Sequence, residues 1–407
     1  MRISTAHAYD TTIRELQDRQ QTLARSQQQL TTGKRVVDAS DDPTNAARAE
    51  RALARVARSD ANQRTLDASR NVMNLASSSL SNATDLLQTA RETLMAAGNG
   101  SYSDSDRQSL AVKLKDIRDQ LLSVANRDDG GGGFVFGGQG SSSPPFIETA
   151  NGVIFQGQAG EALASTGERL SLTVDGQKVW LSGKSGNGVF TTAPDPAASS
   201  GGAWITSGTV TNPSDLPYPS NGGPSPSYQL VFHSGASGIT YDVMEDGGAL
   251  ATGLQYHNGS SLAIPGRGMA VAVSGTPAEG DTFQIGEAHN DLNIFSVLDQ
   301  AISAIKTPNV TGSNVAQAVN TGLTNVDAAL SSLQGAQSEV GEQLNRMDGL
   351  ESRNQDMKLA AKTEKSNAED LDMVQALSDF KNQDTGYQAA LQSYAMVQKL
   401  SLFSYIS

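Results

Sequence analysis

The chain of 407 residues contains no cysteine, and only 5% of its residues are aromatic. Without cysteine it can form no disulfide, no thiolate zinc site and no thiol nucleophile. Its mean hydropathy is −0.36, which indicates a polar chain with a thin core rather than a compact enzyme. No run approaches the ~18 apolar residues of a membrane span. The first residues, MRISTAHAYD, lack the apolar core of a secretory signal, so we expect any export to use another route.

Positive charge is also scarce, since 30 Lys and Arg face 43 Asp and Glu for a net charge of −13. A chain this acidic repels nucleic acid and anionic lipid, and we expect neither as a partner. One basic row stands out. Arg48, Arg51, Arg55 and Arg58 are three and four residues apart and share one helix face. Such a row could bind nucleic acid, but the overall charge favours a solvated face or a contact with an acidic subunit.

What the sequence does contain is a seven-residue repeat at both ends, which is typical of helices packed lengthwise. Near the N-terminus, Leu16, Leu23 and Leu30 recur at this spacing, but glutamines share the seam and weaken it. A stronger series follows at Leu66, Met73, Leu80, Leu87 and Leu94, with alanines three residues after most of them.

The C-terminal part repeats the pattern from Val319 to Met347, slips in phase before Leu371, and then resumes. Such slips change supercoil winding and can mark a domain boundary. The resumed stripe and the apolar chain end supply candidate interface residues: Leu377, Phe380, Tyr387, Leu391, Tyr394, Leu400, Leu402 and Phe403.

The middle of the chain is different, with short alternating segments and loops rich in Pro, Gly and Ser. The segments YQLVFHSGASGITYDVME and MAVAVSGTPAEGDTFQIG predict strands, and RLSLTVDGQKVWLSG predicts a hairpin turning at Asp175-Gly176. The order helical, β-rich, helical indicates an insertion over residues 141–285. Because neither helical stripe can be buried alone, both ends must pair. We therefore predict an α+β protein: a long antiparallel coiled-coil bundle formed by both chain ends, with an inserted β-rich domain.

The stretch LTTGKRVVDASDDPTNAA, residues 30–47, predicts a joint between two helices. It lacks the upstream glycine and the Ser or Thr of a phosphate loop, and its acidic residues lack calcium-loop spacing. Gly33 suits the left-handed end of a helix, Asp42 can cap the next helix, and Pro43 fits that helix's first position.

Catalytic signals are absent. The four histidines are scattered without metal-ligand spacing, and no G-x-S-x-G elbow holds a nucleophile. A carboxylate pair for glycoside hydrolysis could still lie within the insertion, since such pairs meet only in space. We expect no enzyme, no metal and no cofactor.

Several motifs resemble the flagellin superfamily. LTTGKRVVDASDDPTNAARA is similar to its first helix joint, and GGFVFGGQGSSSPPF is similar to the exit from its helical part. The end ALSDFKNQDTGYQAALQSYAMVQKLSLFSYIS and the opening Met1-Arg2-Ile3-Ser4 resemble the hook–filament junction members more than filament flagellins. SGTPAEGDTFQIG is similar to the family's return segment. These matches span about half the chain.

The resemblance implies an extracellular structural adaptor of the bacterial flagellum that joins hook to filament and is exported by a type III route. It implies terminal helices, 1–42 and 366–407, that line a tube; a rod of 43–140 and 286–365; and an outward β domain, 141–285. The terminal helices would fold on assembly. The implied partners are further copies in a ring of about eleven, another hook-associated protein, flagellin, and an export chaperone on the C-terminal helix.

Two other functions fit parts of the sequence. A filament flagellin would share the architecture and polymerise alone, although the tail SLFSYIS departs from flagellin ends. An adhesin or enzyme carried on the insertion would use the helices only as an anchor.

Overall fold

The computed structural model describes residues 2–163, 170–200, 202–218, 224–236, 238–308 and 312–406, except the side chains of 2–6, 8, 9 and 397–406. The chain divides into two compact units. Unit 1 comprises Met1–Thr65 and Gly349–Ser407, and unit 2 comprises Leu66–Asp348. Across the part of the chain that the structure describes, none of the helices combines the length and apolarity needed to span a membrane.

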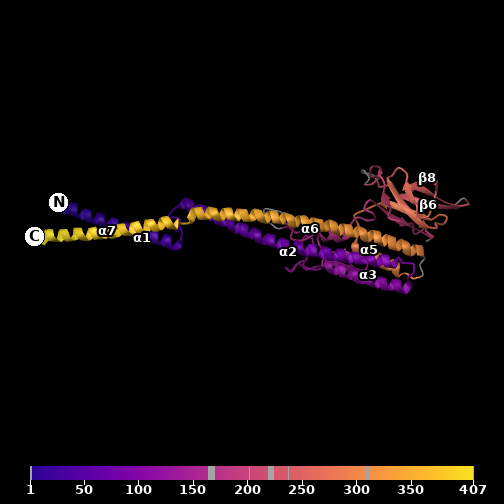
Figure 1. Cartoon of the computed structure of the whole chain (residues 1–407), viewed down its shortest axis with the longest axis horizontal. Helices are drawn as coiled ribbons and strands as arrows, with labels where there is room; N and C mark the ends of the chain where they lie inside the picture. The colour runs from indigo at the N-terminus through magenta and orange to yellow at the C-terminus, as the bar shows by residue number, and fades with distance from the viewer. Residues whose placement is uncertain are drawn as a thin grey trace. The chain divides into compact units, whose positions relative to one another are not determined.

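Unit 1 is made of helices from both chain ends. α1 (Arg2–Thr32) lies beside α7 (Met373–Ile406), with both termini at the same end of this pair (Figure 1). The first part of α2 (Pro43–Ala97) runs antiparallel to the last part of α6 (Gly312–Glu369). Ion pairs fix that direction: Arg55 Nη1 lies 2.6 Å from Glu364 Oε2, and Lys358 Nζ lies 2.5 Å from Asp60 Oδ1.

Unit 2 contains the long apolar seam between the remaining parts of α2 and α6. The heptad of α2 is buried throughout, with no more than 5% exposure from Leu66 to Leu94. Its alanines let α6 approach closely, and Gly322 of α6 lies against Leu94. On α6, a strict seven-residue series is buried: Val319, Val326, Leu333, Val340 and Met347.

Two shorter helices complete the helical body of unit 2. α3 (Asp104–Ala125) begins with a capping box between Ser103 and Asp106 and packs against α5 (Ile294–Lys306), whose first turn Asn293 caps. A hairpin of β1 (Phe146–Thr149) and β2 (Gly152–Phe155) joins them. Between these elements lies a cluster of aromatic rings: Phe136, Phe146, Phe155, Trp180 and Phe295.

The β module, residues 183–292, is the part of unit 2 that begins and ends at a bridge between Gly183 and Leu292. Their backbone N–H groups donate to each other's carbonyls at 3.1 and 2.9 Å. The module contains two antiparallel sheets that share one hydrophobic core. A short 3₁₀ helix, η1 (Pro213–Asp215), lies in one of its loops.

The first sheet has the order β3-β11-β6-β7-β8, and in the second sheet β10 pairs with β4, β5 and β9. The strands are β3 (Phe190–Pro194), β4 (Ala203–Ile205), β5 (Thr209–Val210), β6 (Tyr228–Gly235), β7 (Gly238–Glu245), β8 (Gly248–Gln255), β9 (Ser261–Ile264), β10 (Met269–Gly275) and β11 (Thr282–Glu287).

The hairpin predicted at Asp175-Gly176 is wrong. Asp175 instead caps a short helix, α4 (Gly176–Leu181), by accepting a hydrogen bond from the Lys178 N–H at 3.2 Å. Gly176 is required for close packing rather than for a turn, because a Cβ there would lie 2.2 Å from the carbonyl oxygen of Phe136. Of the alternating residues that suggested the second strand, Val179 is buried on this helix beside Trp180, whereas Leu181 is half-buried.

The predicted class is confirmed: the protein is α+β, with long antiparallel helices from both chain ends and β-rich residues inserted between them. The two segments predicted to form strands at 228–245 and 269–286 form β6, β7, β10 and β11. The phase slip predicted between Met347 and Leu371 is wrong for α6, because its buried positions continue at seven-residue steps through Asn354, Ala361 and Ala368, and only smaller or polar residues replace the large apolar ones. The three-part domain division stays a prediction.

Candidate functional site

The α1–α7 pair is the least covered part of the described chain. Leu16, Leu23 and Leu30 are half-buried, and no described side chain of either helix is fully buried. A polar contact joins the two helices, since Ser26 Oγ donates to Gln383 Oε1 at 2.8 Å. Two helices cannot enclose a core between them, so this pair gains little from its own packing.

On α7 the uncovered surface is apolar. Val374 is 84% exposed and Leu377 60% exposed, and Met373 and Met396 are also exposed. Of the other predicted interface residues, Leu391 is exposed, whereas Phe380, Tyr387 and Tyr394 are half-buried. Leu400, Leu402 and Phe403 lie outside the described side chains. Exposed large apolar groups on a helix indicate a surface that another molecule covers.

The predicted helix joint, residues 30–47, lies beside the connection between α6 and α7. Gly33 has a φ of 70° and its N–H donates to the Gln29 carbonyl at 2.9 Å, which ends α1. The Gly33 carbonyl then accepts from the Leu371 N–H at 3.0 Å, and the Arg35 N–H donates to the Glu369 carbonyl at 2.7 Å. Backbone hydrogen bonds thus join the connection that follows α1 to the connection that follows α6.

The second half of the joint starts α2. Pro43 is its first residue, and Asp42 Oδ1 accepts from the Asn45 N–H at 3.0 Å. Hydrogen bonds from the backbone and side chain of Asn45, together with Arg35, lower the pKa of Asp42 to about 2. Asp41 fixes the connecting turn by accepting from the N–H groups of Val37 and Asp38.

The arginine row, Arg48, Arg51, Arg55 and Arg58, lies on the first turns of α2 and is exposed throughout. Only Arg55 has an acidic partner in the described part of the chain, Glu364. The structure therefore leaves three of the four cations available on one face of unit 1.

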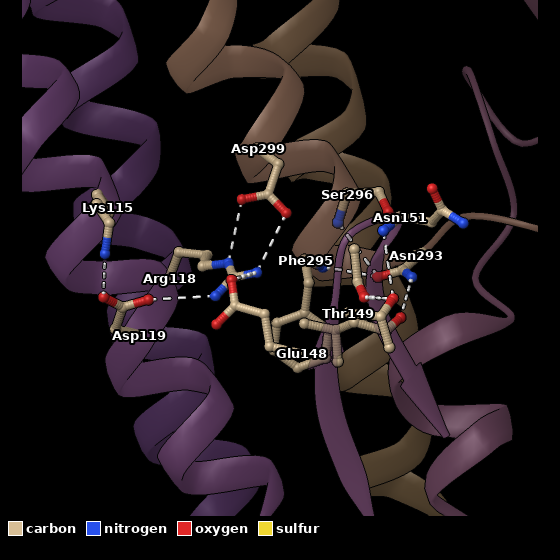
Figure 2. A network of polar contacts seen from close by, with 12 residues as sticks. Lys115, Arg118, Asp119, Glu148, Thr149, Asn151, Asn293, Phe295, Ser296 and Asp299 are labelled. Carbon is tan, nitrogen blue, oxygen red and sulfur yellow. Dashed lines mark hydrogen bonds and ion pairs between the residues drawn. The ribbon is translucent and has the colours of Figure 1, made fainter. Parts of the chain in front are cut away.

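One buried cation in unit 2 was not predicted from the sequence. Arg118 on α3 is 3% exposed and meets the carboxylates of Asp299 on α5 at 3.1 Å and Glu148 on β1 at 3.0 Å (Figure 2). Burial alone would lower the pKa of its guanidinium, but the hydrogen bonds to Glu148 and Asp299 outweigh burial and raise this pKa. The only sequence feature that could have indicated this buried cation is that Arg118 lies between Ile117 and Leu121, which belong to an apolar stripe. Its role is to join three elements of the helical body.

The described residues contain no group of three or more His, Asp or Glu side chains arranged to hold a metal ion. A cleft of about 710 Å³ in unit 2 lies between the base of the β module and α6. Glycine, serine and asparagine residues, together with Lys178, Lys184 and Asp327, line most of it. It contains no aromatic platform and no nucleophile with an adjacent base.

With this geometry in hand, comparisons with known proteins point to one class. Residues 3–141 match the family described as bacterial flagellin N-terminal helical region. Over 99% of both chains, the sequence is 27% identical to flagellar hook-associated protein 3 of Escherichia coli K12. It is 28% identical, at the same coverage, to the protein of that name from Salmonella typhimurium LT2.

Solved structures agree. Flagellar hook associated protein-3 from Legionella pneumophila is 27% identical, with a TM-score of 0.69 over 77% of this chain and 97% of that chain. FlgL from Xanthomonas campestris is 26% identical, with a TM-score of 0.66 over 78% of this chain and 99% of that chain. The N-terminal match and the fold are those of flagellin-like proteins. The chain is, over its full length, a homologue of flagellar hook-associated protein 3.

Proposed function

We propose that this chain is a structural adaptor of the bacterial flagellum, placed where hook and filament join. The observation that carries the proposal is the combination of full-length similarity to hook-associated protein 3 with the uncovered α1–α7 pair. A helix pair with exposed Val374 and Leu377 needs neighbouring molecules to bury its apolar side chains, and an assembly of copies supplies them.

In this proposal the predicted interface residues on α1 and α7 contact other copies in a closed ring of about eleven, the number implied by the family resemblance. Another hook-associated protein lies on the hook side and flagellin on the filament side. Before assembly, an export chaperone binds the amphipathic C-terminal helix in a groove. The protein leaves the cell through the flagellar export route, and its role is mechanical rather than enzymatic.

Localisation tests the proposal. Because the chain has no cysteine, a single Thr252→Cys substitution on the exposed surface of β8 allows specific maleimide labelling of the full chain. The expected result is one fluorescent spot at the base of each filament. Label along the filament would instead indicate a flagellin, and label absent from flagella would refute any flagellar role.

A second measurement separates an adaptor from an adhesin. Cells that lack the chain are expected to make hooks but to shed flagellin into the medium, and the T252C chain is expected to restore attached filaments. Filaments that stay attached without the chain would contradict an adaptor role.

A further inference from the structure

Charge is divided unevenly between the two units. Unit 1 contains 17 Lys and Arg against 16 Asp and Glu, for a net charge of +1. Unit 2 contains 13 Lys and Arg against 27 Asp and Glu, for a net charge of −14. Nearly all the excess acidity therefore belongs to unit 2, and copies that met through unit 2 alone would repel each other.

The arginine row is the strongest basic feature of unit 1. Its members follow each other at three- and four-residue steps, so they extend along about 15 Å of one helix face. The described residues provide no carboxylate partner for Arg48, Arg51 or Arg58, and Arg51 Nε donates only to the Ala47 carbonyl of its own helix. Ala54 lies exposed on the same face, three residues after Arg51 and four before Arg58.

A groove of about 790 Å³ adjoins the row within unit 1. Asn45 and Arg48 of α2 line it from one side, and Leu359, Thr363 and Asn367 of α6 line it from the other, together with the carboxylates of Asp356 and Glu364. Glu364 is engaged by Arg55. Leu359 is 65% exposed. The surface thus combines an apolar side chain, polar groups and a row of arginines of which three have no carboxylate partner among the described residues, which suits a partner with carboxylates on its surface.

Resting on the proposed function, we infer that the arginine row of one copy contacts the acidic unit 2 of a second copy. Charge complementarity selects this occupant, because unit 2 has a net charge of −14 whereas unit 1 is close to neutral. The two contacting patches differ, so the contact is heterologous, and repeating it generates a ring or an open helical array rather than a two-fold dimer.

Photo-crosslinking in intact flagella tests the contact. The full chain is produced with benzoylphenylalanine in place of Ala54, which keeps all four arginines of the row. Flagella are isolated, irradiated and digested, and the crosslinked peptides are identified by mass spectrometry. The expected product joins two copies of the chain, with the second peptide derived from residues 66–348.

Four results would overturn the inference: a crosslink to residues 1–65 or 349–407 of the second copy, a crosslink only to another flagellar protein, a crosslink to nucleic acid, or no crosslink from a chain present in flagella. Absence of the chain from flagella would refute the proposed function itself, and the contact with it. The two failures are therefore distinguishable.

A charge-reversal pair supplies the matched control. R51E/R58E is expected to lower the yield of the inter-copy crosslink about tenfold, because like charges then face each other. Reversal of two other exposed cations of unit 1, R14E/K362E, is expected to leave the yield unchanged. Circular dichroism must show both variants folded. Equal yields from both would show that the row does not make the contact.

Discussion

His233 of β6 lies between two carboxylates on the surface of the β module. Its Nδ1 lies 3.0 Å from Glu279 Oε1, and its Nε2 lies 3.2 Å from Asp242 Oδ2 on β7. The hydrogen bond to Glu279, aided by Asp242, raises the pKa of the imidazole above its ordinary 6.5. The pKa of His233 is higher in the folded than in the unfolded state. The protonated imidazole, held by its two carboxylates, therefore stabilises the module fully below about pH 6.5. This stabilisation disappears as the pH rises through the folded-state pKa.

We therefore expect Glu279→Gln to lower the pKa of His233, measured by NMR titration of its ring protons. The melting temperature should also differ more between wild type and E279Q at pH 6 than at pH 8. Asp116→Asn, which removes an exposed carboxylate of α3, serves as the control and should leave the His233 pKa unchanged. An unchanged His233 pKa in E279Q would show that the Glu279 contact does not set it.

Single residues also show where the sequence could and could not be interpreted. Gly33, Asp42 and Pro43 lie at a helix end, a cap and a first turn because each residue type suits its local backbone. The hairpin prediction at Asp175-Gly176 failed because glycine is needed there to leave room for the backbone carbonyl of Phe136, which lies forty residues earlier. Local signals predict local geometry, whereas a close approach between distant segments leaves no local signal.

At the scale of elements, a buried polar layer interrupts the α2–α6 pair in unit 1. Asn354 is 4% exposed, and its Nδ2 donates to the Ser59 carbonyl at 2.9 Å and to Gln63 Oε1 at 3.1 Å. Its Oδ1 has no hydrogen-bond partner among the described residues. A single buried asparagine between paired helices costs stability but fixes their register.

Replacement of this asparagine should separate stability from register. Asn354→Leu is expected to leave the free energy of unfolding unchanged or to raise it by up to about 2 kcal/mol, because an unsatisfied polar atom is removed. Register is reported by a short bismaleimide joining D60C to K358C, positions whose native side chains form an ion pair. This crosslink should become less efficient in N354L. A loss of stability together with full crosslinking would contradict the role given to Asn354.

The heptads illustrate what an element-level pattern predicts. The same spacing is buried at Leu66 to Leu94 and only half-buried at Leu16, Leu23 and Leu30. Periodicity identifies the residues that share a helix face, but it does not say whether this chain covers the face. In unit 2, other helices of the same unit cover the apolar face of α2. In the α1–α7 pair, the described residues leave the apolar face partly exposed. That difference, and the buried Arg118, became visible only in the structure.

At the scale of the whole molecule, the β module is joined to unit 2 in a way that makes it removable. Its two ends, Gly183 and Leu292, are bonded to each other by two backbone hydrogen bonds. Its strands have their own hydrophobic core. The hydrogen bonds between the module and α6 lie in and beside β4: Ile205 is bonded to the side chains of Gln317 and Asn320, and Ser313 Oγ donates to the Gly202 carbonyl. The helical seam from Leu66 to Leu94 contains no residue of the module.

We therefore expect a chain that lacks residues 184–291, with Gly183 joined to Leu292 by a short Gly-Ser linker, to fold as a helical protein. Removal frees Gln317 and Asn320 to bind water, which costs little, so the melting temperature of the helical body should stay within about 5 °C of the full chain. Circular dichroism measures the melting. Fluorescent labelling through Thr65→Cys, a half-exposed site of α2 outside the module, should still give one spot at each filament base.

Adding Leu87→Ala to the shortened chain should destabilise it, since truncating a fully buried seam residue lowers the free energy of unfolding by about 2–5 kcal/mol. The shortened chain should tolerate Val112→Ala, whose side chain on α3 is 61% exposed. If loss of the module alone unfolded the helices, the module would be part of the bundle's core. If the shortened chain folded but no longer reached the filament base, the β module itself would carry the junction contact. In that case the paired chain ends would not be sufficient for assembly.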